Sequence, residues 1–255
     1  MVRVMNKRNV LILITSVIAL ALLMAVFFVG SENDSEHTTI TSIQKSENVE
    51  VECIYDKHQL YEAKKAACVQ IECGHSSGSG IIWKVTPEDI VLLSNRHLLE
   101  ADHIARVSFV TGICYDAEVY FLSENYDYGL AVIKRKQMEP EDAEGIEQAT
   151  YEAIQSSEMR IGEPLYILTS AEYPGDMVLE SSLAEVESFV EIEQLYTPQN
   201  MMLGMLNGEE EHHVAAGMSG SGVYNERGAL VGILSGGDGK REYMMVPIWN
   251  LLTGL

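Results

Sequence analysis

The sequence predicts an all-β globular domain, a β-sandwich or a β-barrel, that follows one apolar N-terminal segment. Beyond residue 60 the chain divides into short apolar runs rich in β-branched and aromatic residues, and most of them end at Gly, Asn, Asp, Ser or Pro. These runs do not alternate with long amphipathic helical segments, so the pattern argues against a parallel sheet built from βαβ units.

Short strands are expected throughout the domain. The runs lie at residues 67–71, 80–85, 90–93, 105–110, 117–122, 130–133, 165–169, 177–188, 222–224, 230–234 and 243–247. Residues 136–159 are acidic and contain no β-branched run, which predicts a connecting segment with one or two helical turns. Near the C-terminus, Ile248, Leu251 and Leu252 have helical spacing and predict a short closing helix that packs on the core.

An almost unbroken apolar run occupies residues 10–29, which is long enough to cross a bilayer as a helix. Arg3, Lys7 and Arg8 precede the run, so the positive-inside rule predicts a cytoplasmic tail over residues 1–9 and a single-pass protein of the cell membrane. A cleavable signal peptide is the alternative interpretation. Such a peptide usually has a shorter apolar core and a small-x-small cleavage site.

After the predicted span, residues 30–50 are polar and lack an apolar period, which predicts a stalk. Residues 51–255 are then the extracytoplasmic globular domain. Beyond residue 29 the chain carries 14 Lys and Arg against 38 Asp and Glu, a formal charge of −24. Such a charge repels nucleic acid and anionic lipid, so the sequence excludes a nucleic-acid-binding protein.

Four cysteines, Cys53, Cys68, Cys73 and Cys114, follow the predicted span. Disulfides persist outside the cytoplasm, and four cysteines permit three pairings between which the sequence does not choose. Free buried thiols are the alternative. The spacing contains no CxxC pair and does not match a zinc ribbon.

A methionine-rich segment at residues 201–208 and a Glu/His run at 209–213 lead into a glycine-rich loop. The methionines suit either an adaptable lining of a substrate pocket or an apolar hairpin tip. The Glu/His run fits a solvated acidic loop better than a metal or activation site. We therefore expect no metal here.

The glycine-rich loop itself reads GMSGSG over residues 217–222, and an apolar strand follows at once. Flanking glycines allow a sharp turn, and they let the amides of Gly217 and Ser219 approach a substrate carbonyl as an oxyanion hole. Ser219 is thus a candidate nucleophile. A purely structural Gly-Ser turn between strands is the alternative.

Two further residues support a catalytic interpretation. His97 follows a predicted strand end in the segment LSNRHLL, and Asp127 precedes a predicted strand in NYDYGLAVI. Either residue alone is commonly structural. Together with Ser219 they occur in the order His, Asp, Ser, which distinguishes chymotrypsin-type peptidases from subtilisin and the α/β-hydrolases. The order predicts His97 as general base, Asp127 as the group that orients it, and no cofactor.

Over roughly residues 60–250 the chain resembles the chymotrypsin-like serine peptidases, most closely the catalytic domain of the HtrA/Deg group. The motifs that carry the resemblance are SGSGII at 77–82, SNRH at 94–97, the segment 109–119 and the loop with its following strand at 217–233. The resemblance implies two six-stranded β-barrels of the chymotrypsin type with a short C-terminal helix, and no PDZ-like domain. It also implies an endopeptidase that cleaves protein or peptide substrates through an acyl-enzyme.

One departure from the family leaves an alternative open. The family usually reads Asp-apolar-Ala-apolar, whereas Tyr128 and Gly129 separate Asp127 from Leu130. A register with Gly129 in the acid's place would remove the aspartate from the triad. We expect Asp127 to be the acid, because it is the acid nearest to the strand. A catalytically silent module that binds protein partners is the competing function.

Overall fold

The computed structural model describes residues 54–143, 146–149, 158–172, 174–191, 198–207 and 213–253. The predicted tail, membrane span and stalk lie outside these residues. Within the described ranges, no helix is both long and apolar enough to cross a bilayer.

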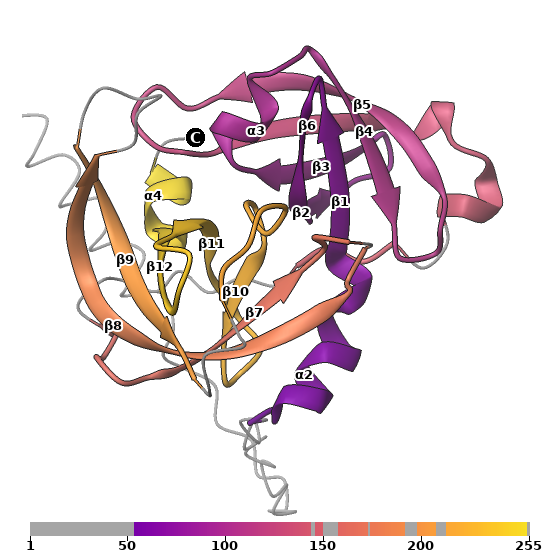
Figure 1. Ribbon diagram of the computed structural model, residues 1–255. Coiled ribbons are helices and arrows are strands. Elements are labelled where there is room, and N and C mark those ends of the chain that lie inside the picture. The colour runs from indigo at the N-terminus through magenta and orange to yellow at the C-terminus, as the bar shows by residue number, and fades with distance from the viewer. Residues whose placement is uncertain are drawn as a thin grey trace, which may run out of the picture. The chain divides into compact units, whose positions relative to one another are not determined.

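The first half of the domain is a closed antiparallel barrel. Its strands, coloured indigo to magenta in Figure 1, are β1 (Cys68–Cys73), β2 (Ser76–Val85), β3 (Asp89–Ser94), β4 (Ile104–Phe109), β5 (Cys114–Leu122) and β6 (Gly129–Lys134). Around the barrel they follow the order β1-β2-β3-β6-β5-β4.

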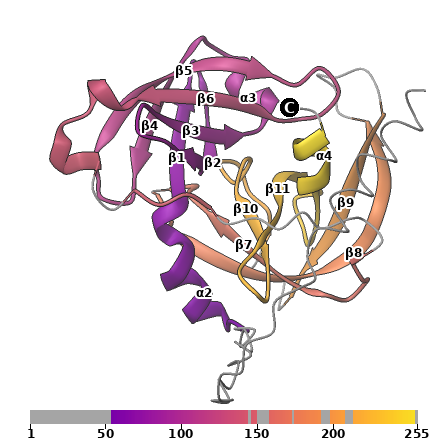
Figure 2. The same cartoon turned by 180° about the vertical axis from the view of Figure 1, so that it is seen from behind.

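A second closed barrel follows in the chain. Its strands are β7 (Pro164–Thr169), β8 (Met177–Glu191), β9 (Pro198–Leu206), β10 (Gly222–Asn225), β11 (Leu230–Gly237) and β12 (Glu242–Pro247). They close in the order β10-β11-β12-β9-β8-β7. Figures 1 and 2 show the two barrels side by side. The predicted pair of six-stranded barrels is therefore confirmed.

In the part of the chain that the structure describes, helical structure is limited to short segments. The helices are α2 (Lys57–Lys64), α3 (Arg96–Leu99) and α4 (Ile248–Thr253), and the 3-10 turns are Lys65–Ala67, Arg135–Gln137 and Pro140–Ala143. The last two turns fall in the predicted connecting segment, part of which lies outside the described residues. The predicted closing helix is confirmed as α4. Ile248 and Leu251 are fully buried in it, but Leu252 is exposed because it points about 100° around the helix from Leu251.

The expected strands are all present, but the sequence analysis missed β9. Met201 and Met202 are adjacent in this strand and both fully buried. Met201 packs in the cluster between the barrels, whereas Met202 packs inside the second barrel. Burial on both faces at this pair breaks the alternation that identifies a half-buried strand, although Asn200, Leu203 and Met205 on either side are only partly buried. The prediction of a hairpin tip or a methionine-lined pocket at Met201 and Met202 is therefore wrong.

The helix α2 was also missed, although its N-terminal signal was visible in the sequence. The carboxylate of Asp56 accepts a hydrogen bond from the Gln59 amide at 2.8 Å, and the Gln59 side chain accepts one from the Asp56 amide at 3.1 Å. This capping box satisfies two amides that would lack partners. Leu60 is its one buried side chain, which leaves almost no apolar period to detect.

Three apolar clusters hold the domain together. One fills each barrel, and the third lies between them and combines Trp83 and Tyr128 with Met201, Tyr224 and Ile248. Complete burial of an aliphatic or aromatic side chain stabilises the folded state by about 1.5–3 kcal/mol. The cluster between the barrels therefore fixes how one barrel sits on the other.

The described cysteines are free thiols. Cys68 and Cys73 are buried, and Cys114 is exposed. Burial raises the pKa of the Cys68 thiol to about 12, so it is neutral at neutral pH. The free-thiol alternative therefore holds for these three, while Cys53 lies outside the described residues.

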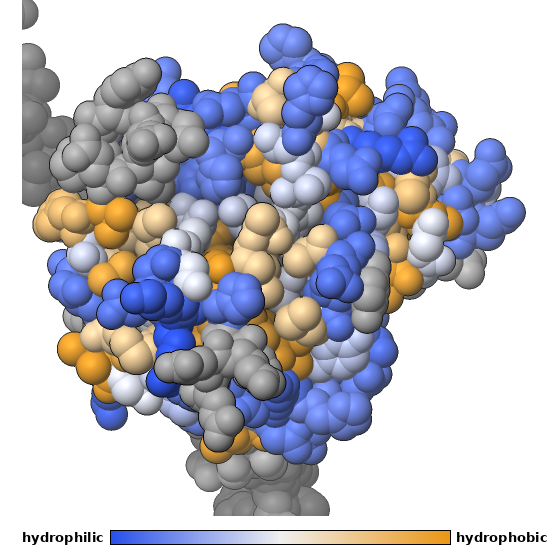
Figure 3. All heavy atoms as spheres, in the orientation of Figure 1, coloured by the Kyte–Doolittle hydropathy of each residue, from blue (hydrophilic) through white to orange (hydrophobic). Residues whose placement is uncertain are grey.

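On the face drawn in Figure 3, hydrophilic side chains are abundant and apolar ones are interspersed among them. This surface agrees with the high content of acidic residues in the sequence.

Candidate active site

His97 is presented to solvent by the short helix α3. This helix follows β3 directly, and its apolar residues Leu98 and Leu99 are buried against the first barrel. Burial of these two neighbours turns His97 to the other side of the helix. The His97 side chain is 25% exposed.

Asp127 lies beside His97 and is completely buried. Its Oδ2 accepts a hydrogen bond from His97 Nδ1 at 2.8 Å, and its Oδ1 accepts one from the His97 backbone amide at 3.0 Å. Ser235, from β11 of the second barrel, also donates its hydroxyl to Oδ2. Because a carboxylate only accepts, the proton of neutral His97 is held on Nδ1, which leaves Nε2 free to act as a base.

The structure brings Asp127 to His97, and not position 129. Gly129 is the first residue of β6 and pairs with Ser94 and Leu122. A Cβ atom there would lie 2.8 Å from Leu122 Cδ2 and 3.1 Å from Leu99 Cδ1. Any side chain at Gly129 would therefore enter the barrel core, away from a solvent-facing histidine.

The loop that carries Ser219 requires glycine at two positions, 217 and 220. Gly217 and Gly220 have φ angles of +91° and +86°. A Cβ atom on Gly220 would also lie 2.0 Å from the Ser79 carbonyl oxygen. These positions bring the loop against the first barrel, beside Gly78 and Leu98.

The Ser219 hydroxyl donates a weak hydrogen bond to the Ser235 carbonyl at 3.4 Å. Among the described residues, none joins it to His97. Ser235 thus contacts both Ser219 and Asp127, which places the three predicted residues around one point. Catalytic hydrogen bonds are often long without substrate and tighten in the substrate complex.

Ser79 of β2 fixes the backbone on both sides of Met218. Its amide donates to the Ser219 carbonyl at 2.8 Å, and its hydroxyl donates to the Gly217 carbonyl at 3.0 Å. The hydroxyl also accepts from the Ser170 amide at 2.9 Å. Within the described part of the chain, the amides of Gly217 and Ser219 have no acceptor, as an oxyanion hole requires.

The electrostatics of His97 favour its charged form. Burial of the ring by itself would lower the pKa of His97, but the hydrogen bond and the charge of Asp127, with help from Glu100, outweigh it and raise this pKa above its usual value. The imidazolium that would form during catalysis is therefore stabilised.

The candidates predicted from the sequence, His97, Asp127, Gly217 and Ser219, lie together in the structure, but the hydrogen bonds that Ser235 and Ser79 make to them were not predicted. Both are buried serines inside strands; Ser79 lies in the SGSGII motif, but nothing in the sequence identifies the residues that Ser79 or Ser235 contacts. They act through contacts with residues 108 and 138 positions away.

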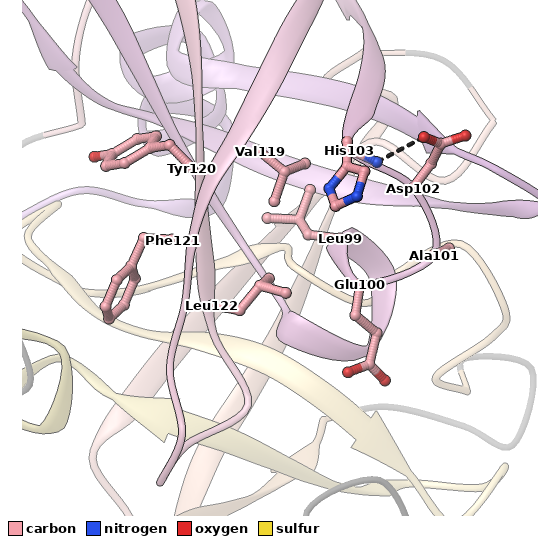
Figure 4. A pocket seen from close by; sticks show the side chains of 9 residues that line it. All are labelled: Leu99, Glu100, Ala101, Asp102, His103, Val119, Tyr120, Phe121 and Leu122. Carbon is pink, nitrogen blue, oxygen red and sulfur yellow. Dashed lines mark hydrogen bonds between the residues drawn. The ribbon is translucent and has the colours of Figure 1, made fainter.

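Several concavities lie outside the His97–Ser219 site, and two of them adjoin segments named above. One, of about 550 Å³, follows α3. In Figure 4, Leu99, Val119 and Leu122 lie between α3 and β5, while the carboxylates of Glu100 and Asp102 lie on the loop side. The other, of about 580 Å³, is lined by Met205, His213 and residues 238–242. Residues 208–212, with most of the Glu/His run, lie outside the described residues.

Comparison with known proteins agrees with this architecture. Residues 78–233 match the trypsin-like peptidase domain family. The match covers more than half of the chain, so the chain belongs to the trypsin-like peptidases. A search of curated proteins found no match to the sequence.

Solved structures with the same fold include three proteases. The Rv3671c protease of M. tuberculosis H37Rv, in an inactive form, is 13% identical with a TM-score of 0.57, over 77% of this chain and 90% of that one. The HtrA-type protease AlgW with a tripeptide is 17% identical with a TM-score of 0.58, over 76% and 60%. The MamO protease domain from Magnetospirillum magneticum is 17% identical with a TM-score of 0.59, over 76% and 98%.

We predict that His97 titrates above the ordinary histidine value of about 6.5, and that Asp127→Asn lowers its pKa because an amide carries no charge to stabilise the imidazolium. NMR of the full chain in mild detergent, with labelled histidine rings, measures this pKa. The His97 signal is assigned by its loss in His97→Gln. Glu124→Gln, which alters an exposed acid close in sequence, should leave the value unchanged. An unchanged pKa in Asp127→Asn would contradict the assigned contact.

Proposed function

We propose that the protein is a membrane-anchored serine endopeptidase that acts outside the cytoplasm. The observation that carries the proposal is the buried Asp127 carboxylate, hydrogen-bonded to His97 Nδ1 and to Ser235, whose carbonyl contacts Ser219. Membership of the trypsin-like peptidases supports the same chemistry. The AlgW structures solved with a tripeptide and a decapeptide support peptides as the substrate class.

In the proposed reaction, Ser219 Oγ attacks the carbonyl carbon of the scissile peptide bond while His97 Nε2 takes its proton. The amides of Gly217 and Ser219 donate to the developing oxyanion. His97 then transfers the proton to the leaving amine, which leaves an acyl group on Ser219. A water molecule, deprotonated by the same histidine, hydrolyses this ester and restores the enzyme. Asp127 holds His97 in the required tautomer.

The edge of β11 offers a place for the substrate backbone. Strand β10 pairs with β11 only as far as Ile233, and Gly220 bonds to Leu234. Among the described residues, the segment 235–237 therefore continues past Ser219 with no strand paired to it on the β10 side. A peptide added there would bring its carbonyl to the amides of Gly217 and Ser219.

Beside this edge, Val214 narrows the space for the side chain that precedes the scissile bond. Val214 lies three residues before Gly217, and a Cβ atom on Gly237 would lie 2.9 Å from Val214 Cβ. The segments around Val214 and Gly237 therefore lie close together, and we infer that the crevice between them is narrow. We propose that a small side chain is preferred at this position of the substrate.

A silent module that binds protein partners is the second candidate. The weak contact of Ser219 with Ser235, in place of one with His97, is the observation in its favour. Covalent labelling of the serine separates the two candidates.

A fluorophosphonate probe should label the full chain, and Ser219→Ala should abolish both labelling and peptide hydrolysis, with a loss of about 10⁴-fold or more in kcat. His97→Ala should reduce labelling because the serine loses its base. Ser77→Ala, which removes an exposed hydroxyl in the adjoining strand, is the matched control and should keep full labelling. Absence of labelling in the folded wild-type chain would favour the silent module.

Val214→Ala should widen the crevice and raise kcat/KM for peptides with Leu or Phe before the scissile bond, by about 10-fold relative to the Ala peptide. The measurement is the ratio of kcat/KM values over a matched peptide series. Val178→Ala changes a partly buried valine on β8 and should leave this ratio as it is. If the ratio does not move in Val214→Ala, the crevice is not the pocket for that side chain.

The full chain should remain in the membrane pellet after a carbonate wash, because residues 10–29 are apolar and long enough to span the bilayer. A chain that begins at Ser31 should be released into the supernatant and hydrolyse peptides at the wild-type rate. Release of the full chain by carbonate would contradict the anchor, and leave the peptidase proposal unaffected.

A further inference from the structure

Gln199 is a buried polar residue for which the proposed mechanism has no role. It lies at the start of β9 in the second barrel, paired with Val190 of β8, and is 1% exposed. Its Oε1 accepts a hydrogen bond at 2.9 Å from the backbone amide of Asp127, which belongs to the first barrel. The side chain therefore links the two barrels at the acid of the triad.

The backbone around Asp127 explains why this acceptor is needed. The Tyr128 amide donates to the Tyr126 carbonyl at 2.9 Å, so Asp127 is the central residue of a three-residue γ-turn. Ser123 accepts the Tyr126 amide and donates its own amide to the Tyr128 carbonyl. These bonds close the turn without using the Asp127 amide, which is buried and has Gln199 as its acceptor.

The main chain of Asp127 is thus held from two directions. Asn95 Nδ2, from the first barrel, donates to the Asp127 carbonyl at 2.9 Å. Gln199, from the second barrel, accepts the amide on the other side. Because the amide and the carbonyl of Asp127 are both fixed, only one orientation of its carboxylate allows hydrogen bonds to His97 and Ser235 at the same time. Loss of the Gln199 acceptor would leave a buried amide unpaired and free the turn to rotate.

We propose that Gln199 is a positioning residue that aims the carboxylate of Asp127 at His97 by accepting the Asp127 amide. The catalytic role of Gln199 rests on the proposed function. The orientation of the Asp127 carboxylate toward His97, however, can be measured through the His97 pKa without any peptide hydrolysis. Gln199 touches no reacting atom, so its effect is exerted entirely through Asp127.

The decisive measurement is the His97 titration by NMR in the full chain carrying Ser219→Ala. Methionine has nearly the same shape as glutamine but cannot accept the Asp127 amide. Gln199→Met should therefore lower the His97 pKa, because the Asp127 carboxylate loses its alignment with His97 Nδ1. Gln199→Glu keeps an acceptor oxygen and should not lower it. The charged groups that act on His97 are Asp127 and Glu100, which Gln199→Met leaves in place. Gln199→Glu adds a carboxyl group beside Asp127, which can only raise the His97 pKa further.

Gln70→Met is the matched control. Gln70 also joins the barrels, since its Nε2 donates to the carbonyls of Ala171 and Glu172 at 3.3 and 3.1 Å, but it contacts neither Asp127 nor His97. This variant should leave the His97 pKa at the wild-type value. If Gln199→Met does not fold, Gln199→Asn, whose amide is one methylene too short, takes its place with the same expected result.

With the Ser219 hydroxyl present, Gln199→Met should lower kcat about 10-fold or more and change KM less than about 2-fold. A His97 pKa that is unchanged in Gln199→Met, or lowered equally by Gln199→Glu, would overturn the positioning role. Failure of the wild-type chain to hydrolyse peptides would instead overturn the proposed function, and the titration would still decide the role of Gln199.

Discussion

The buried carboxylate of Asp127 is the constraint on which the rest of the site depends. An ionised carboxylate without partners is costly to bury, by several kcal/mol, so the fold must supply donors to it. They come from both barrels, with His97 from the first and Ser235 from the second. The barrels therefore have to meet in one arrangement for the acid to be satisfied. That same arrangement places Ser219 beside the strand that carries Ser235.

The glycine-rich loop that carries the candidate nucleophile Ser219 is also positioned by hydrogen bonds between the barrels. Ser79 belongs to the first barrel, yet its amide and hydroxyl hold the carbonyls on either side of Met218 in the second. Donors oriented before the substrate arrives need no reorganisation in the transition state, which is where electrostatic catalysis gains most. The candidate site is thus organised by hydrogen bonds that cross from one barrel to the other, and the apolar cluster between the barrels supplies the cohesion.

The strand β11 connects these functions. Its Leu234 exchanges backbone hydrogen bonds with the loop of residues 217–222, its Ser235 contacts both Asp127 and Ser219, and its Gly237 lies close to Val214. One strand therefore contacts the candidate acid Asp127 and the candidate nucleophile Ser219, and it also forms the edge where we propose that the substrate binds. A rigid strand holds such groups more precisely than a loop would. Its glycines at 236 and 237 allow a peptide backbone to approach.

The sequence by itself determined the all-β class, the expected strands, the closing helix and the order of His97, Asp127 and Ser219. Those features are encoded locally, in β-branched runs, turn residues and glycines. Only the tertiary structure decided β9, whose adjacent methionines are both buried, and only it brought Asp127 rather than position 129 to His97. The contacts of Gln199, Ser79 and Ser235 were not predicted either, because their partners lie 72 to 138 residues away and hydrogen bonds of that separation leave no periodic trace in the chain.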